Sequence, residues 1–292
     1  MKLFVLFSTI LVAVVLSQTT YLNDPLVTVR ADGVPEKPVT VEHSRLLSFL
    51  LQLFPARFAL KEARDLMHTA ERAIALTFGL QSVENQLPKA GEPCPSVTII
   101  YARGTYEIGN VGVLVGPGFF EAVKLATSAT NSSVSVAVQG VEYAAIFPEY
   151  VKGGDRAGSQ KMYSYPPSQS IQVPGARSAT DFLPITRADD VSQALEVCPQ
   201  TKVVMAGFSQ GGQVVHNAAA QLPPATMAQV SSVVIFGDPL NGTAVAGAVP
   251  ERVLVLCHES DIICQGSLFV PLSHMTYLAD VGEAAEFVAK HL

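Results

Sequence analysis

The amino-acid sequence predicts an α/β fold: a doubly wound, mainly parallel five-stranded sheet with helices on both faces. Two observations lead to this prediction. Short runs of apolar, β-branched residues recur without polar alternation, which is typical of strands buried on both faces of a parallel sheet. Helical stretches separate these runs, and a strand followed by a helix and another strand favours the right-handed crossovers of such a sheet.

The expected elements fall within one domain, residues 91–292. Strands are predicted at residues 96–101, 135–138, 202–205, 232–236 and 252–256. Helices are predicted at residues 118–128, 176–197, 210–221 and 280–291. Residues 151–178 are rich in Gly, Ser, Pro and Tyr, a composition that predicts a long surface loop.

An N-terminal helical extension within residues 18–90 precedes this domain. Residues 18–40 are polar and contain prolines, as a flexible leader would. Apolar residues at helical spacing then predict two helices within residues 41–83, the second with a charged face. That face is expected to consist of Lys61, Glu62, Arg64, Asp65, Glu71 and Arg72. The extension either packs its apolar face on the domain or acts as a propeptide or lid.

The first residues have the features of an export signal. Lys2 precedes an apolar run at residues 3–16, and the small residues Val15 and Ser17 suit the positions before a cleavage site, so residues 1–17 are interpreted as a signal peptide. The apolar run is short for the ~20 residues of a membrane-spanning helix, so an uncleaved anchor is the weaker interpretation. We therefore expect a secreted, extracellular protein without a stable membrane anchor.

The composition argues against several classes of protein. Of 292 residues, 49% are hydrophobic and 15% are charged, which is enough apolar material for a core and too little charge for a disordered chain. The net charge of −6 argues against a nucleic-acid partner, because that binding needs Lys and Arg to neutralise phosphates. The absence of Trp argues against an appended carbohydrate-binding module with an indole platform.

The four cysteines of an exported chain are expected to form disulfides. Four cysteines allow three pairings. Cys257 and Cys264 are close enough in sequence to close a small loop, which would leave Cys94 and Cys198 as a long link. A zinc site is the weaker interpretation, because no C-x2-C pairs or paired histidine ligands accompany them, and no metal is expected.

The strongest chemical signal is the segment Gly207-Phe208-Ser209-Gln210-Gly211. It lies where a predicted strand ends and a predicted helix begins, which is the context of a G-x-S-x-G nucleophile elbow. Glycines on both sides allow close backbone approach at a strained turn, and the helix N-terminus stabilises developing negative charge. We interpret Ser209 as a nucleophile.

A serine hydroxyl needs a base, and in this fold the chain order is Ser, acid, His. His274 lies in a loop before the last helix, where that base belongs. His216 is expected on the elbow helix, His258 follows a strand end beside a cysteine, and His291 is at the terminus. His274 is therefore the expected base.

Two aspartates compete for the role of the acid. Asp261 follows the second strand after the elbow, which is the usual position, and lies inside the segment bounded by Cys257 and Cys264. Asp238 follows the first strand and precedes a proline, which is more typical of a turn. Asp261 is preferred, and Glu259 is a minor third candidate.

An oxyanion hole needs donors from the loop after the first strand and from the residue after the nucleophile. Thr105 in the segment Ala102-Arg103-Gly104-Thr105 can donate both a backbone N–H and a hydroxyl, and Gln210 follows Ser209. Each such donor lowers the barrier by roughly 3 kcal/mol.

Together these motifs resemble the cutinase family. The resemblance rests on Ala102-Arg103-Gly104-Thr105, on Cys198-Pro199 before the elbow, on the C-x3-D-x2-C loop at 257–264, and on Gly266-Ser267 with His274 shortly after. It covers residues 94–292. The extension at 41–83 and the enlarged segment 151–178 depart from the family pattern.

The resemblance implies an α/β-hydrolase with Ser209, Asp261 and His274 as a triad and Thr105 and Gln210 as the oxyanion hole. It implies the disulfides Cys94–Cys198 and Cys257–Cys264. Members are exported, monomeric, need no cofactor, and hydrolyse esters of cutin and similar lipidic or synthetic substrates, so plant cutin is the expected partner.

The segment before His274 bears on the substrate. Leu268, Phe269, Val270 and Leu272 are expected to form an apolar rim, and an acyl chain gains about 0.8 kcal/mol per buried CH2 from such a rim. This favours a cutinase over the similar acetylxylan esterases, whose sugar substrate gains nothing from it. A non-catalytic surface or elicitor protein on the same scaffold is an alternative of another class.

Overall fold

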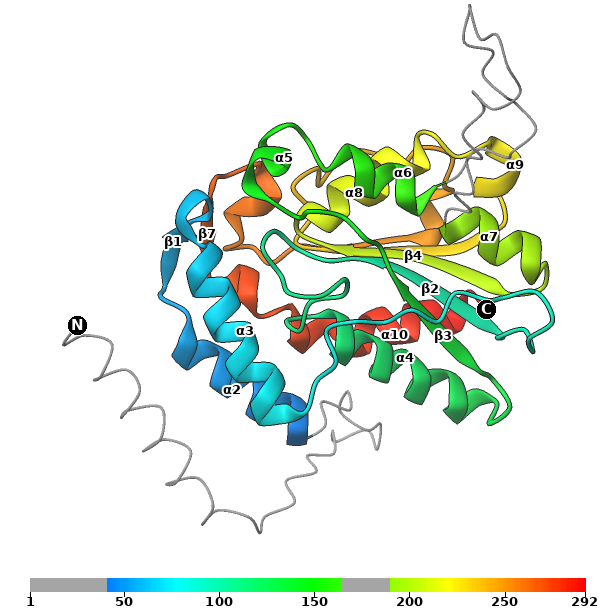
Figure 1. Ribbon diagram of the computed structural model, residues 1–292, viewed down its shortest axis with the longest axis horizontal. Coiled ribbons are helices and arrows are strands. Elements are labelled where there is room, and N and C mark those ends of the chain that lie inside the picture. The colour runs from blue at the N-terminus through cyan, green and yellow to red at the C-terminus, as the bar shows by residue number, and fades with distance from the viewer. Residues whose placement is uncertain (1–40, 164–189) are drawn as a thin grey trace, which may run out of the picture. The chain divides into compact units, whose positions relative to one another are not determined.

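The computed structural model describes residues 41–163 and 190–292 (Figure 1). The predicted signal peptide and leader lie outside these residues. So do residues 164–178 of the expected surface loop and residues 176–189 of the helix expected at 176–197.

Five strands form one sheet in which every neighbouring pair is parallel. They are β2 (Val97–Ala102), β3 (Val136–Gly140), β4 (Lys202–Phe208), β5 (Val230–Phe236) and β6 (Val253–Leu256). Their order across the sheet is β3-β2-β4-β5-β6, so the direction of winding reverses between β2 and β4. In open α/β sheets, binding sites lie outside the carboxyl ends of the strands at such a reversal.

Both faces of the sheet are buried. Successive side chains of a strand point to opposite sides, so each strand contributes to two separate core clusters. Ile99 and Tyr101 of β2 belong to one core cluster, whereas Ile100 and Ala102 belong to a second. Helices α4 (Gly116–Thr130) and α10 (Val281–Lys290) cover the first face, and α6 (Arg156–Met162), α7 (Asp190–Val197) and α8 (Gln210–Ala219) cover the second (Figure 1). The predicted doubly wound α/β class is confirmed.

The segment expected to be a long loop contains helices. Helix α5 (Phe147–Val151) ends at its first residue, and helix α6 lies inside it. The prediction of a loop throughout 151–178 is therefore wrong at residues 156–162. The cause is local: the Asp155 side chain accepts a hydrogen bond of 2.8 Å from the Gly158 backbone N–H and caps α6. A further short helix, α9, spans Pro224–Met227.

The N-terminal extension packs on this domain. It comprises α2 (Val41–Leu53), strand β1 (Arg57–Ala59), a 3-10 turn η2 (Leu60–Glu62) and α3 (Arg64–Phe78). Its apolar side chains share one core cluster with β2, α4 and α10; the buried members are Leu46, Leu50, Phe54, Leu60, Ala63, Met67, Ala70 and Ile74.

A small second sheet joins the extension to the end of the chain. Strand β1 pairs antiparallel with β7 (Phe269–Pro271), with Phe58 opposite Val270. The remaining 3-10 turns are η4 (Pro250–Arg252), η5 (Ile262–Gln265), η6 (Leu272–Met275) and η7 (Tyr277–Asp280). Helix α2 contacts η6 and η7. The extension therefore lies against the turns that carry residue 274.

Both expected disulfides are present. Cys94 is bonded to Cys198, with 5.5 Å between their Cα atoms, and Cys257 to Cys264, with 6.2 Å. Within residues 41–163 and 190–292, the helices are too short or too polar to cross a bilayer.

The burial of α3 predicts that the extension contributes to global stability. Ile74 is fully buried, so Ile74→Ala should lower the free energy of unfolding by about 2–5 kcal/mol. Leu76, two residues away, is 86% exposed, and Leu76→Ala should change it by less than about 0.5 kcal/mol. Urea denaturation of both variants checks this; equal effects would mean that α3 is not part of the cooperative unit.

Candidate active site

Ser209 occupies a strained turn between β4 and α8. Its backbone has φ 56° and ψ −120°, a region that L-residues rarely adopt. A Cβ at Gly207 would lie 2.5 Å from the Gly211 carbonyl carbon, and a Cβ at Gly211 would lie 2.0 Å from the Ala102 oxygen. Only glycine fits at either position, so the glycines of the motif let the turn close against the end of β2.

Backbone hydrogen bonds hold this turn in place. The Ser209 N–H donates to the Phe236 carbonyl at the end of β5 (2.9 Å), and the Gly212 N–H donates to the Ser209 carbonyl (2.8 Å). Ser209 thus stands at the N-terminus of α8, where the helix dipole favours negative charge.

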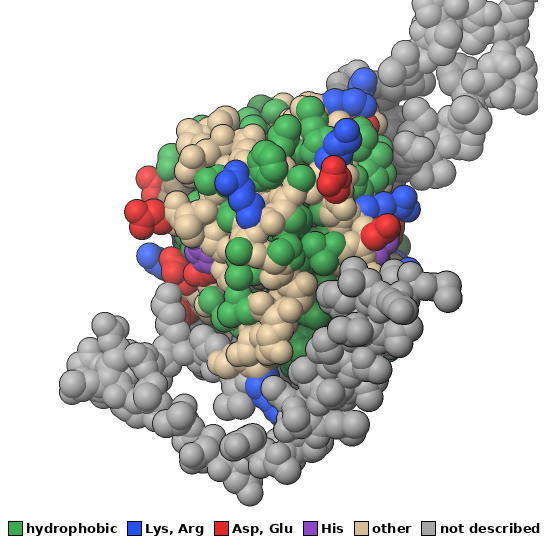
Figure 2. Space-filling view, turned by 90° about the vertical axis from the view of Figure 1, so that its left-hand side faces the viewer, with side chains coloured by type: hydrophobic (Ala, Val, Ile, Leu, Met, Phe, Trp, Pro, Cys, Tyr) green, Lys and Arg blue, Asp and Glu red, His purple; other side chains and the backbone are tan. Residues whose placement is uncertain are grey.

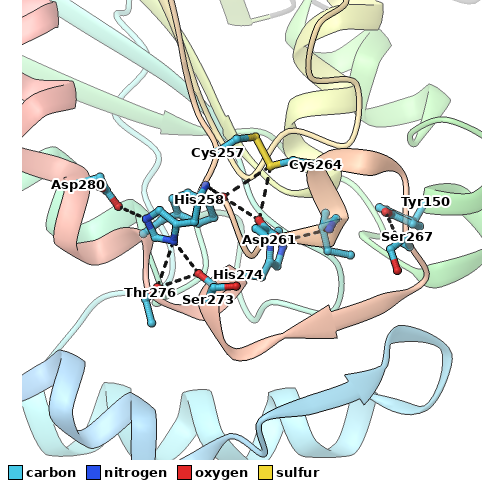
Figure 3. Close-up of polar contacts among 12 residues, drawn as sticks. Tyr150, Cys257, His258, Asp261, Cys264, Ser267, Ser273, His274, Thr276 and Asp280 are labelled. Carbon is cyan, nitrogen blue, oxygen red and sulfur yellow. Dashed lines mark hydrogen bonds and ion pairs between the residues drawn. A yellow bond between two sulfur atoms is a disulfide. The ribbon is translucent and has the colours of Figure 1, made fainter.

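His274 and Asp261 form a buried pair (Figure 3). His274 Nδ1 lies 2.7 Å from Asp261 Oδ2, and both side chains are almost fully buried. His274 is carried by the turn η6, and Asp261 caps η5 between the two bonded cysteines. This contact joins two loops that emerge from the carboxyl side of the sheet.

Further donors hold the Asp261 carboxylate. Tyr277 Oη donates to Oδ2 (2.7 Å), and the Ile263 N–H donates to Oδ1 (3.0 Å). Burial alone would raise the pKa of Asp261, but the hydrogen bonds from His274, Tyr277 and Ile263 outweigh it and leave that pKa below its ordinary value. The carboxylate therefore stays charged and can stabilise an imidazolium.

The imidazole of His274 packs against the elbow. Its ring stacks on the ring of Phe208, the residue before Ser209, with 4.9 Å between ring centroids. A Cβ at Gly237 would lie 2.6 Å from its Cε1, so the glycine after β5 makes room for the ring. Among the described residues no hydrogen bond joins Ser209 to His274, and such catalytic contacts often tighten only when substrate binds.

The alternative acids and the other histidines of the described residues have other surroundings. Asp238 is buried but pairs with His216 of α8, at 2.8 Å from Nε2 to Oδ2, and its Oδ1 accepts from the Leu240 N–H. Glu259 is exposed. His291 bonds the Phe287 carbonyl within α10. Only Asp261 bonds His274 among these candidates.

The two expected oxyanion donors lie beside the elbow. Thr105 is 3% exposed, and among the described residues its hydroxyl has no hydrogen-bond partner. Gln210 is fully buried and begins α8, with its side-chain amide donating to the Ile146 carbonyl (2.9 Å). A Cβ at Gly104 would lie 2.9 Å from the Phe208 ring, so the loop that carries Thr105 is packed directly on the elbow.

Glu107 braces the loop after β2, which carries Thr105, from inside. Its carboxylate accepts from the backbone N–H groups of Gly104 (2.7 Å), Val113 (3.2 Å) and Leu114 (3.1 Å). Arg103 donates to the Glu107 carbonyl. These contacts close the loop around a carboxylate.

Arg103 ties the same loop to the segment after β3. Its guanidinium donates to the Tyr143 carbonyl (2.7 Å) and lies over the Tyr143 ring, and the Tyr143 hydroxyl donates back to the Arg103 carbonyl. The loop is therefore held from two sides.

A second carboxylate reaches this loop from the extension. Glu71 of α3 is fully buried, and its Oε2 accepts from the Ile108 N–H at 2.7 Å. Burial and the nearby Glu107 carboxylate raise the pKa of Glu71 well above its ordinary value; burial also raises that of Glu107, against its backbone hydrogen bonds. The expectation that Glu71 lies on a charged face is wrong. With Met67, Ala70 and Ile74, it occupies helical spacing on the apolar stripe, and this spacing was the signal available in the sequence.

The expected rim residues divide between surface and core. Leu268 and Phe269 are 46% and 49% exposed, and Leu272 is half-buried. Val270 is buried, because alternate residues of β7 point to opposite faces. Figure 2 views the end of the molecule that carries β1 and β7 and shows hydrophobic side chains gathered across it.

The described residues offer no site for a metal ion, in that no three His, Cys, Asp or Glu side chains converge there.

The role of Glu71 predicts a difference between two substitutions. Glu71→Ala leaves the half-buried Ile108 N–H without its acceptor and should lower the free energy of unfolding by about 1–3 kcal/mol. Glu71→Gln keeps an acceptor of the same shape and should cost less than half as much. Chemical denaturation measures both; a Gln variant as unstable as the Ala variant would contradict the proposed contact.

Comparisons with known proteins identify the family of this chain. The family model described as "Cutinase" matches residues 93–179 and 186–292. A cutinase of Hypocrea jecorina is 38% identical over 245 residues, which cover 84% of each chain, and a cutinase of Botryotinia fuckeliana is 45% identical over 197 residues, 68% of this chain and 83% of its own.

A solved structure extends the similarity to the fold. It is titled as Trichoderma reesei cutinase in complex with a C11Y4 phosphonate inhibitor, with a TM-score of 0.62, 36% sequence identity, and coverage of 84% of this chain and 97% of that chain. The family match and these relatives together show that the chain belongs to the cutinase family of carboxylic ester hydrolases.

Proposed function

We propose that Ser209, His274 and Asp261 are the triad with which this chain hydrolyses cutin-like polyesters and short-to-medium acyl esters. The observation that carries the proposal is the buried His274–Asp261 hydrogen bond of 2.7 Å, with its imidazole stacked on the residue before the elbow serine. The orientation of that ring is fixed from both sides, by the Asp261 carboxylate and by the Phe208 face.

The reaction follows from these positions. Ser209 Oγ attacks the ester carbonyl while His274 takes its proton, and Asp261 stabilises the imidazolium. The oxyanion that forms is bound by Thr105 and by the backbone at Gln210, beside the N-terminus of α8. His274 then protonates the leaving alcohol. Water, activated by the same imidazole, attacks the acyl-enzyme and releases the acid.

The surroundings of the site favour an acyl substrate. Leu268, Phe269 and Leu272 lie just before His274 in the chain, and the first two expose apolar surface. The Arg57 guanidinium carbon of β1 lies 4.8 Å from the Phe269 ring centroid, so the extension lies against this apolar rim. An aliphatic acyl chain gains free energy from such a surface and a polysaccharide does not.

Export and the role of the extension belong to the same proposal. The leading sequence and two disulfides suit an extracellular enzyme that acts as a monomer on plant cutin. The Leu60 N–H donates to the Leu268 carbonyl and the Leu272 N–H to the Ala56 carbonyl, which supports a lid or fixed wall at residues 41–90 more than a removable propeptide.

Ser209→Ala should abolish ester hydrolysis. Loss of the nucleophile is expected to lower kcat on p-nitrophenyl butyrate by roughly 10⁴-fold or more. Ser128→Ala on the exposed side of α4 is the matched control and should retain full activity. A p-nitrophenyl alkylphosphonate should label the native enzyme at Ser209 with release of p-nitrophenol, seen by mass spectrometry. Retained activity in Ser209→Ala would reject the enzymatic proposal.

The substrate class is tested by acyl preference. We expect p-nitrophenyl butyrate and a cutin-like polyester to be hydrolysed in preference to acetylated xylan. Phe269→Ser should raise KM several-fold for the butyrate and leave the acetate nearly unchanged, since about 0.8 kcal/mol is at stake per CH2. Leu125→Ser, at an equally exposed leucine on α4, is the control. Preference for xylan would instead identify an acetylxylan esterase.

A further inference from the structure

His258 lies directly behind the proposed triad. It follows β6 and the bonded Cys257, and Figure 3 shows its ring between Asp280 and the turn that carries Ser273, His274 and Thr276. Its Nε2 lies 2.7 Å from Asp280 Oδ2, and its Nδ1 lies 2.9 Å from the Ser273 carbonyl oxygen. The ring also stacks on Tyr277, with 4.2 Å between centroids.

Both ring nitrogens therefore face acceptors. A carboxylate and a backbone carbonyl cannot donate. The Thr276 hydroxyl, 3.3 Å from Nδ1, donates to the nearer Ser273 carbonyl at 2.7 Å. A neutral imidazole carries one N–H and would leave either the Asp280 or the Ser273 contact without a proton, whereas an imidazolium donates to both. The geometry therefore favours the charged ring.

The electrostatics agree with the geometry. The hydrogen bond to Asp280 raises the pKa of His258, partial burial opposes it, and the Ser273 carbonyl and the charges of Asp280 and Asp261 add to the increase. Tyr277 is the other titratable side chain that faces the ring, and the neighbouring Glu259 is exposed. The surroundings of the ring are thus predominantly anionic.

These contacts brace the base and the acid together. The Ser273 carbonyl belongs to η6, one residue before His274. The His258 backbone N–H donates to Tyr277 Oη (3.0 Å), which in turn donates to Asp261 Oδ2 (2.7 Å). One residue therefore fixes both the turn that holds the imidazole of the triad and the hydroxyl that orients its carboxylate.

We propose that His258 is a positioning residue: as an imidazolium it links the His274 turn to Asp280 at the start of α10, and loss of its proton sets the alkaline limit of hydrolysis. The proposal rests on the triad described above. The brace is complete below the ordinary pKa of histidine and is lost as pH rises through the higher value in the folded protein. We expect kcat to fall there while KM stays, because the ring hydrogen-bonds to Ser273 and Asp280, which are not residues of the apolar rim.

The test is a pH–rate profile of purified full-length enzyme with p-nitrophenyl butyrate, for wild type, Asp280→Asn and His258→Gln. Asp280→Asn keeps the shape of the partner and removes its charge, so the alkaline limit of kcat should move down by about one pH unit. His258→Gln should lower the plateau of kcat by roughly ten- to a hundredfold and remove that alkaline ionisation. The acid limb of the profile should stay in place in every variant.

A control and a direct measurement complete the test. His291→Gln changes a histidine that bonds only within α10 and should leave the profile unchanged. Imidazole 15N NMR of the wild type, assigned by the signal absent from His258→Gln, should show two N–H groups on His258 at pH 6. A neutral ring at that pH, or an unmoved alkaline limit in Asp280→Asn, would overturn the proposal. Either of these results can be obtained while Ser209→Ala still abolishes hydrolysis. Failure of the His258 proposal would therefore leave the proposed triad untouched.

Discussion

The strained backbone at Ser209 is the constraint on which the rest of the site depends. A left-handed conformation at a non-glycine residue costs of order 1–3 kcal/mol and persists only where its surroundings determine it. Among the described residues, Tyr106, Ala145 and Ser209 alone combine a side chain with positive φ. Tyr106 donates its N–H to the Ala145 carbonyl and follows Thr105 in the loop after β2, so the strain is concentrated around one site.

Buried carboxyl groups provide much of the surrounding order. Glu107 accepts hydrogen bonds from three backbone N–H groups of the loop after β2, and Asp261 accepts hydrogen bonds from η5, η6 and η7. A buried carboxylate that lost these donors would be left unpaired at high cost, which makes each loop adopt one conformation. Glu71 does the same from the extension. The hydrogen bonds of these buried carboxyl groups therefore favour a single conformation of each loop.

Prediction from the sequence succeeded where the signal was local. The elbow is defined by neighbouring glycines, and the five strands of the main sheet are continuous apolar runs, so neither needs knowledge of distant contacts. The pairing of β1 with β7 depends on segments more than two hundred residues apart, and each strand has only three residues, too few to show a period. The orientation of Val270 follows from that pairing and could not be inferred without it.

His258 shows the same limit from another side. Its sequence neighbours, a cysteine and an acidic residue, give no sign that its partners lie fifteen and twenty-two residues away, at Ser273 and Asp280. Those partners are set by how η6 and η7 fold back on β6. Strand β7 leads directly into η6, and it is also the strand that pairs with β1. The extension, the apolar rim and the proposed general base are thus parts of one connected structure, because β7 pairs with β1 and only Leu272 and Ser273 separate the end of β7 from His274.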